Sequence, residues 1–282
     1  MTEIKTIGVC GAGTMGSQLA ALFAGAGFDV LLFDLNQELS KGGLEGALKA
    51  KPAAFYDKRF AEKVTPLNYE EDLDRISECD WVVEVIAERL DWKHDLYQKI
   101  QTRLKPEAIL SSNTSGIPLS SLIEPLEEDV RQRFLITHFF NPPRYMRLVE
   151  IVPGPDTSEE VLRGMEEFIG KTLGKGIVHA KDTPNFIANR IGVYGMMLSL
   201  RLTKQMGLSI EQVDAISGPV MGRPGSATYR TADRVGLDTL AAVARTSYER
   251  CPEDEARELF EANPVLEQLI ERKALGQKTK GG

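Results

Sequence analysis

One histidine and one glutamate are spaced so that they could act as a catalytic pair. His138 ends the apolar segment 134–137, and Glu150 follows twelve residues later between apolar neighbours. A neutral imidazole suits proton exchange near neutral pH, and a buried carboxylate needs a partner. The pair therefore indicates a base that takes the proton of an alcohol, with Glu150 fixing the tautomer of the ring. Spacing alone leaves open that Glu150 is an unrelated residue of an edge strand.

Other polar side chains in apolar surroundings could hydrogen-bond a hydroxyl or carbonyl oxygen. Ser115 closes the polar run 111–115 after a predicted strand, and Asn189 lies in the first turns of a predicted apolar helix. Each could also be a helix cap or a buried polar group that is satisfied by its own neighbours. His94 lies in a charged helical stretch, and we expect it to be solvated.

A glycine-rich turn links an apolar run at 6–10 to a predicted helix at 17–26. Its glycines permit a tight turn, a close approach of the backbone to a pyrophosphate, and close helix packing. Asp34 ends the next apolar run, 18 residues after Gly16. A carboxylate there accepts hydrogen bonds from a ribose diol and repels a 2′-phosphate, so NAD is favoured over NADP. The cofactor-binding residues predicted from this pattern are Gly11, Gly13, Thr14, Met15, Gly16 and Asp34.

The glycine-rich turn has alternative interpretations besides NAD binding. The glycines could form a plain strand-to-helix turn with Asp34 as a solvated cap. Flavin or simple phosphate binding is disfavoured by the short path from the turn to Asp34.

The elements that must position these residues alternate between strands and helices. Alternation of this kind predicts an α/β fold with a Rossmann-type, mostly parallel sheet covered on both faces. The predicted strands are 6–10, 30–34, 81–86, 109–111, 134–139, 148–152 and 177–178, and the predicted helices between them include 17–26, 91–104 and 158–173.

The pattern becomes wholly helical after Pro184. Asp182 or Thr183 can cap a helix there, with Pro184 at its first position. The run 186–202 is apolar nearly all round, which predicts a buried helix. We therefore predict an NAD-binding domain at 1–182 and an all-helical domain at 183–282, which would supply part of the substrate cleft and a dimerisation surface.

Composition narrows the function further. The 282 residues fit about two domains, and the net charge of −7 disfavours nucleic acid as a partner. No apolar stretch approaches the ~20 residues of a membrane span, and the N-terminus lacks a signal-peptide pattern. Three dispersed cysteines and three histidines indicate no metal centre and a reducing compartment, the cytoplasm.

Taken together, these residues resemble the 3-hydroxyacyl-CoA dehydrogenase family over nearly the whole chain. The resemblance implies oxidation of an (S)-3-hydroxyacyl-CoA to the 3-oxoacyl-CoA with NAD, a step of fatty-acid β-oxidation. It implies that His138 is the catalytic base and Glu150 its orienting acid. It further implies that Ser115, Asn141 and Asn189 surround the reacting oxygen, and that Glu88 and Lys93 lie near the nicotinamide. The segments that carry the resemblance are GAGTMG at 11–16, EVIAERLDWK at 84–93, SSNTSGIPLSSL at 111–122, HFFNPPRYMRLVEIV at 138–152 and KDTPNFIANRI at 181–191.

Several features resemble larger proteins that fuse this dehydrogenase to an enoyl-CoA hydratase-like part. They are the segment 50–56, Asn185 where many members have glycine, and the segment 222–230. The end of the chain, 276–282, is similar to the family's glycine-rich lead into an aromatic pair. The expected partners are therefore an acyl-CoA substrate and either a second copy of this chain or a hydratase-like part. Two alternatives stay open, a dehydrogenase of a non-CoA hydroxy or sugar acid and a non-catalytic cofactor-binding module.

Overall fold

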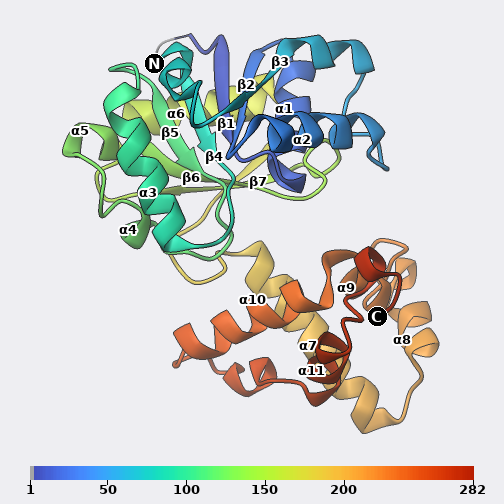
Figure 1. Ribbon diagram of the computed structural model, residues 1–282. Helices are drawn as coiled ribbons and strands as arrows, with labels where there is room; N and C mark the ends of the chain where they lie inside the picture. Colours follow the sequence, from blue (N-terminus) through green and yellow to red (C-terminus); the bar gives the residue numbers. More distant parts are fainter. Residues whose placement is uncertain (1–2) are drawn as a thin grey trace. The chain divides into compact units, whose positions relative to one another are not determined.

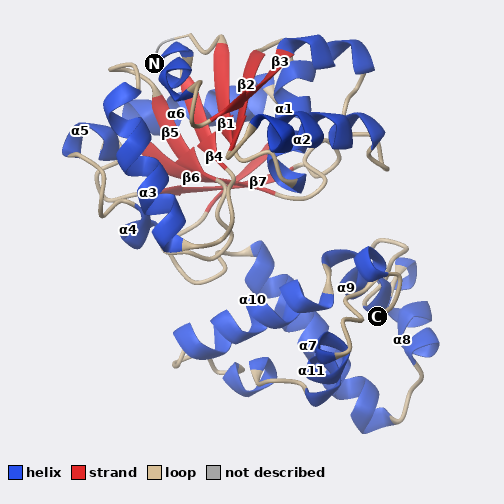
Figure 2. Ribbon diagram, in the orientation of Figure 1, coloured by secondary structure: helices blue, strands red, loops and turns tan. Residues whose placement is uncertain are grey.

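The computed structural model describes residues 3–282. The chain forms two compact units, one that ends at Asp182 and one over Thr183–Gly282 (Figure 1). The first unit holds all eight strands of one sheet, and the second is built from helices (Figure 2). The predicted fold class, a Rossmann-type sheet domain followed by a helical domain, is confirmed.

The sheet has the order β3-β2-β1-β4-β5-β6-β7-β8. All neighbouring strands in it run parallel except β6 and β7, which are antiparallel. The order reverses between β1 and β4, and open α/β sheets bind ligands beyond the carboxyl ends of their strands at such a point. The bounds are β1 (Thr6–Cys10), β2 (Asp29–Asp34), β3 (Val64–Asn68), β4 (Trp81–Glu84), β5 (Ile109–Ser112), β6 (Phe134–Phe139), β7 (Leu148–Pro153) and β8 (Gly176–His179).

The sequence patterns gave no indication of β3. This strand contains Pro66 and lies at the edge of the sheet, where a missing backbone N–H disrupts no pairing on the open side. Pro66 argued against a strand in the sequence, but an edge strand tolerates proline.

Helices cover both faces of the sheet. On one face Phe23 of α1 and Phe168 pack against Trp81 of β4, with ring centroids 5.0 and 5.7 Å from the tryptophan. On the other face Tyr97 of α3 packs edge-on against Phe134 of β6 at 5.7 Å. The helices of this unit are α1 (Thr14–Gly25), α2 (Gln37–Lys49), α3 (Leu90–Ile100), α4 (Leu119–Leu122), α5 (Glu128–Arg131) and α6 (Glu159–Glu167), which continues into a π-helical turn over Phe168–Thr172.

The helical unit has its own small core, to which α7, α10 and α11 contribute Val193, Leu240 and Leu266. Its helices are α7 (Ala188–Met206), α8 (Ile210–Ser217), α9 (Tyr229–Val235), α10 (Leu237–Arg250) and α11 (Pro264–Glu271). Short 3₁₀ turns occupy Lys58–Lys63, Leu73–Glu78, Gln101–Arg103, Pro219–Met221, Arg257–Phe260 and Gln277–Thr279 across the chain.

Two predictions for the start of the helical unit are wrong. The first long helix begins at Ala188 rather than at Pro184, because Asn185 and Phe186 take left-handed backbone angles, φ 63° and 49°, that interrupt the helix. Asp182 caps a different helix, since its carboxylate accepts the backbone N–H groups of residues 119 and 120 at the start of α4.

The prediction that α7 is buried on nearly all sides is also wrong. Within the run 186–202 for which burial was predicted, Val193 and Met197 are buried, whereas Ile191 and Leu202 are 67% and 42% exposed. Some apolar side chains of α7 are therefore not buried by the other helices of the helical unit.

Candidate active site

Three glycines shape the turn that follows β1. Gly11 has φ +113°, and a Cβ there would lie 2.7 Å from the carbonyl oxygen of Val85. A Cβ on Gly16 would lie 1.8 Å from the carbonyl oxygen of Gly11, so glycine is needed for the first turn of α1 to approach the strand. A Cβ on Gly13 would meet nothing within 4 Å. The turn therefore presents bare backbone at Gly13 and the N-terminus of α1, where Thr14 and Met15 form the first turn, as an anion site requires.

Asp34 ends β2 beside this turn. Its Oδ2 accepts the backbone N–H of Ala12 at 2.6 Å, and its Oδ1 accepts that of Leu35 at 2.7 Å. The carboxylate is thereby fixed at the wall of a cavity of about 690 Å³ beyond the strand ends. The cavity is lined by Gly11, Gly13, Asp34, Leu35, Tyr69, Glu70, Leu73, Val85, Ile86, Ala87, Trp92, Asp95, Leu96 and Lys99.

These residues fit a dinucleotide. The open backbone at Gly13 suits a pyrophosphate, and the fixed negative charge of Asp34 suits a ribose diol and opposes a 2′-phosphate.

His138 and Glu150 lie on neighbouring strands. They are paired in the register of β6 and β7, and His138 Nδ1 lies 2.7 Å from Glu150 Oε2. His138 is 5% exposed and Glu150 is fully buried. Because an ionised carboxylate only accepts hydrogen bonds, Nδ1 carries the proton in this pair when Glu150 is charged, which makes Nε2 the basic nitrogen.

Ser115 lies in the turn after β5. Its backbone N–H donates to Oε1 of Glu88 at 3.0 Å, and so does that of Gly116 at 3.1 Å. Asn113, in the same turn, accepts the backbone N–H of Phe139 at 2.9 Å and so ties this turn to the end of β6. The structure thus brings Glu88 and Ser115 together and links their turn to the strand that carries His138.

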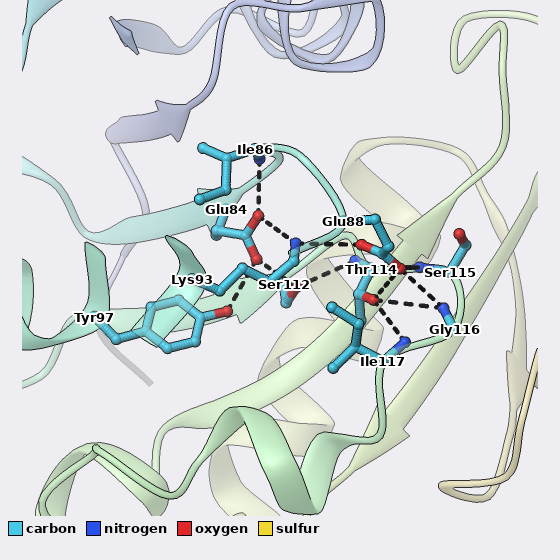
Figure 3. A network of polar contacts seen from close by, with 10 residues as sticks. All are labelled: Glu84, Ile86, Glu88, Lys93, Tyr97, Ser112, Thr114, Ser115, Gly116 and Ile117. Carbon is cyan, nitrogen blue, oxygen red and sulfur yellow. Dashed lines mark hydrogen bonds and ion pairs between the residues drawn. The ribbon is translucent and has the colours of Figure 1, made fainter. Parts of the chain in front are cut away.

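Glu88, whose side chain is 43% exposed, lies at the edge of a buried polar network, and the centre of that network was not predicted from the sequence (Figure 3). Lys93 is 1% exposed, and its Nζ lies 2.6 Å from Oε1 of Glu84 and 3.4 Å from Oε2 of Glu88. Glu84 is fully buried at the end of β4. A single charged residue in the otherwise apolar run 81–86 was the signal that could have revealed it.

The network determines how two of its members titrate. The partial loss of solvent around Glu88 would raise its pKa, but the charge of Lys93 and the hydrogen bonds from Thr114 and Ser115 outweigh this effect, so the pKa lies below its ordinary value. Burial, together with the nearby charge of Glu84, raises the pKa of Tyr97 well above its ordinary value. Glu88 is therefore held as a carboxylate and Tyr97 as a neutral donor.

The two remaining predicted site residues, Asn141 and Asn189, lie in different units. Asn141 is exposed in the connection between β6 and β7, where its Oδ1 accepts Nε2 of Gln18 at 3.4 Å. Asn189 is half-buried in the first turn of α7, in the helical unit. The prediction that His94 is solvated is wrong, because its ring is half-buried and Nε2 lies 2.7 Å from the carbonyl oxygen of Ser121.

The sheet order and the glycine turn with its acid define a dinucleotide-binding, Rossmann-type protein. Comparison with known families identifies it further. The 3-hydroxyacyl-CoA dehydrogenase NAD binding domain matches residues 6–183, and the 3-hydroxyacyl-CoA dehydrogenase C-terminal domain matches residues 186–282. The chain belongs to the 3-hydroxyacyl-CoA dehydrogenase family, whose members are NAD-dependent oxidoreductases, and the predictions of family, enzyme class and cofactor are confirmed.

Individual relatives agree with this assignment. A probable 3-hydroxyacyl-CoA dehydrogenase of Deinococcus radiodurans is 44% identical over 287 residues, which cover 99% of this chain and 82% of the relative. One of Bacillus subtilis is 39% identical over 301 residues, which cover 99% of this chain and 38% of the relative. The crystal structure of (S)-3-hydroxybutyryl-CoA dehydrogenase from Ralstonia eutropha matches with a TM-score of 0.82 at 27% identity, covering 99% of this chain and 98% of that one. The chain thus spans most of the first relative and less than half of the second.

Within residues 3–282, no helix combines the length and the apolar character needed to cross a membrane. Nor does the same range contain three or more histidine, cysteine, aspartate or glutamate side chains grouped so that they could hold a metal ion.

Proposed function

We propose that this chain catalyses the reversible oxidation of (S)-3-hydroxyacyl-CoA to 3-oxoacyl-CoA with NAD, as a step of fatty-acid β-oxidation. The observation that carries the proposal is the contact between His138 and Glu150, at the carboxyl end of a strand in a dinucleotide-binding sheet. Membership of the family supports the acyl-CoA substrate. The similar Ralstonia protein, named for the (S)-3-hydroxybutyryl compound, supports the stereochemistry.

The protein's own residues would manage the proton of the substrate hydroxyl. Gly13, the N-terminus of α1 and Asp34 would hold NAD⁺, which would supply the acceptor for the hydride of carbon 3 of the substrate. His138 would take the hydroxyl proton on Nε2, so that the alcohol loses a hydride and a proton and becomes a ketone. Glu150, at Nδ1, would stabilise the imidazolium that forms and keep the ring in the required tautomer. In the reverse direction the same imidazolium would return the proton to the oxygen.

The other predicted residues would hold the reacting groups. Ser115, Asn141 and Asn189 carry the hydroxyl and amide groups that suit contact with the substrate oxygen. We assign Glu88 and Lys93 to the nicotinamide side of the site, because Glu88 lies beside the Ser115 turn and Lys93 fixes its position. We assign the helical unit, which carries Asn189, to the substrate side.

The surface of the helical unit supports an association with a second protein surface. Several large apolar side chains of this unit are more than half exposed, and exposed apolar side chains that form one contiguous patch mark interaction sites. We propose that this surface binds either a second copy of the chain or a hydratase-like part, and light scattering of the purified chain would distinguish a dimer from a monomer. The residues are Ile191, Met206, Ile210, Ile216, Val220 and Met221, each more than half exposed.

The cysteines support a reducing compartment, for which we propose the cytoplasm. Cys10, Cys79 and Cys251 are free and buried. Burial raises the pKa of Cys79 to about 12, so its thiol is unreactive at neutral pH.

NADH oxidation, followed by absorbance, tests the function directly. We expect turnover with acetoacetyl-CoA and with a long-chain 3-oxoacyl-CoA, and little with NADPH. His138→Gln should abolish turnover and leave NADH binding intact. Activity on a free hydroxy or sugar acid with none on either CoA ester would refute the acyl-CoA assignment. NADH binding without turnover on any of them would favour a cofactor-binding module.

A further inference from the structure

We propose that Glu84 is a positioning residue that connects the wall of the coenzyme cavity to the turn bearing Ser115. The inference rests on the proposed function, because it gives Ser115 and Glu88 roles in the active site. Glu84 itself is remote from solvent, being fully buried at the end of β4. It would therefore act through the groups that it holds.

Four donors converge on the Glu84 carboxylate (Figure 3). Its Oε1 accepts Lys93 Nζ at 2.6 Å and the backbone N–H of Ile86 at 2.8 Å. Its Oε2 accepts Ser112 Oγ at 2.6 Å and Tyr97 Oη at 2.9 Å. The donors come from α3, from β5 and from the segment after β4, and so one side chain joins three elements. A buried charge with this many partners is held rigidly, because every alternative position leaves donors unsatisfied.

One route leads from Glu84 to the turn directly. Ser112 donates its hydroxyl hydrogen to Glu84 and accepts the backbone N–H of Thr114 at 3.1 Å. The side chain of Glu84 therefore orients the Ser112 hydroxyl, whose lone pair then fixes the first bend of the turn.

A second route passes through the lysine. Lys93 bridges Glu84 and Glu88, and Glu88 accepts Thr114 Oγ1 at 2.5 Å. The same Glu88 oxygen collects the backbone N–H groups of Ser115 and Gly116, and Thr114 Oγ1 accepts that of Ile117 at 3.1 Å. The turn over 114–117 is thus held from both sides by groups that depend on Glu84. In Figure 3 the Ser115 side chain points away from this network, which leaves its hydroxyl to face other groups.

Glu84 also holds the wall of the cavity that we assign to the coenzyme. Glu84 accepts the backbone N–H of Ile86, and residues 85–87 line the cavity beside Gly11. The carbonyl oxygen of Val85 is the atom that a Cβ on Gly11 would strike. One carboxylate therefore sets the position of the cavity wall and of the Ser115 turn together.

Charge makes Glu84 more than a hydrogen-bonding partner. Lys93 is shared by two carboxylates, and it lies closer to Glu84 than to Glu88, at 2.6 and 3.4 Å. In Glu84→Gln the ammonium group would be attracted to Glu88 alone. Because Glu88 also accepts the N–H groups of the turn, any shift of Glu88 toward Lys93 would move Ser115.

Hydrogen exchange of the protein without coenzyme or substrate is the first test. In Glu84→Gln we expect the amides of 114–117 to exchange about tenfold or more faster than in the wild type, since their acceptors lose their support. Amides of α6 should be unchanged, and the exposed variant Glu167→Gln should leave the turn at its wild-type rate. Unchanged exchange over 114–117 in Glu84→Gln would overturn the proposal. If this variant does not fold, Ser112→Ala cuts the direct route alone and should speed exchange at Thr114, with unchanged exchange again overturning the proposal.

A double-mutant cycle tests the same point kinetically. We expect Glu84→Gln to lower kcat by about tenfold, as a misplaced contact would, with a smaller change in the KM for the 3-oxoacyl-CoA. Adding Ser115→Ala to this variant should then lower kcat by a much smaller factor than Ser115→Ala does in the wild type, because the two residues act through one contact. If the double variant loses kcat by the product of the two single effects, the residues act independently and the proposal is overturned. Lack of activity in the wild type would refute the proposed function, while the exchange experiment would still decide the role of Glu84.

Discussion

His138 and Glu150 face each other across the antiparallel pair β6 and β7, with 2.7 Å between Nδ1 and Oε2. The two strands are joined by a short connection over 140–147, so residues at similar distances from it become opposite neighbours. The contact therefore depends on the backbone ladder of the sheet rather than on a loop. A pair fixed in this way needs little rearrangement when charge develops on the imidazole, which is what a preorganised base requires.

This pairing predicts the effect of Glu150→Gln. Glutamine keeps the size of the side chain but removes its charge, and its amide can donate to Nδ1 and so favour the wrong tautomer. We expect kcat to fall roughly 10²- to 10⁴-fold, as expected when a triad-type acid is neutralised. Steady-state NADH oxidation with acetoacetyl-CoA measures this, and fluorescence titration should give an unchanged Kd for NADH. A kcat within a few-fold of the wild type would contradict the orienting role of Glu150.

Asp34 should determine the choice of coenzyme. In Asp34→Asn the side chain keeps its shape and loses the charge that attracts a ribose diol and repels a 2′-phosphate. We expect NADH to bind about tenfold more weakly, the amount that hydrogen bonds to a charged group supply, and NADPH to bind relatively better. Fluorescence titrations with both coenzymes check this. Asp29→Asn, at the opposite end of β2, is the matched control and should leave the ratio of the two affinities unchanged.

The lowered pKa of Glu88 predicts how stability depends on pH. A carboxyl whose pKa is lower in the folded state adds stability above its unfolded pKa, about 4.3, and loses that contribution as the pH falls through the folded value. The wild type should therefore be more stable than Glu88→Gln at pH 7, and this advantage should shrink as the solution is acidified below about pH 4. Urea unfolding at several pH values measures the difference. An advantage that stays constant into acid would contradict the shift. Glu167→Gln removes an exposed carboxylate whose pairing with the exposed Lys171 is screened by solvent, so this variant should show a smaller dependence.

The sequence predicted the elements whose patterns are local. The alternation of apolar runs and helices identified the sheet, and the glycine turn with Asp34 identified the cofactor, because both signals lie within about thirty residues. Glu84 was missed since its partners at 93, 97 and 112 become neighbours only through the fold. The start of α7 was misjudged because Pro184 fits a helix N-terminus locally, while the left-handed residues that follow it are fixed by tertiary contacts.

Asn185 illustrates those contacts and leads to a further prediction. It has φ 63° and is 2% exposed, and its Nδ2 donates to the carbonyl oxygen of Val243 at 3.0 Å and to Ser247 Oγ at 2.9 Å. Asparagine tolerates the left-handed region better than most other side chains do, which explains how a residue other than glycine can take this conformation. Its amide then gives the helical unit two buried hydrogen bonds that glycine lacks.

Comparing Asn185→Ala with Asn185→Gly separates the two effects. Alanine loses both hydrogen bonds and keeps the left-handed strain, so we expect it to lower the free energy of unfolding by about 2–4 kcal/mol. Asn185→Gly loses the same hydrogen bonds but relieves the strain, so its loss of unfolding free energy should be about 1 kcal/mol smaller than that of Asn185→Ala. Chemical denaturation of the full chain, followed by circular dichroism, measures both values. If alanine proves as stable as glycine, backbone strain at this position contributes nothing, and the hydrogen bonds alone account for asparagine here.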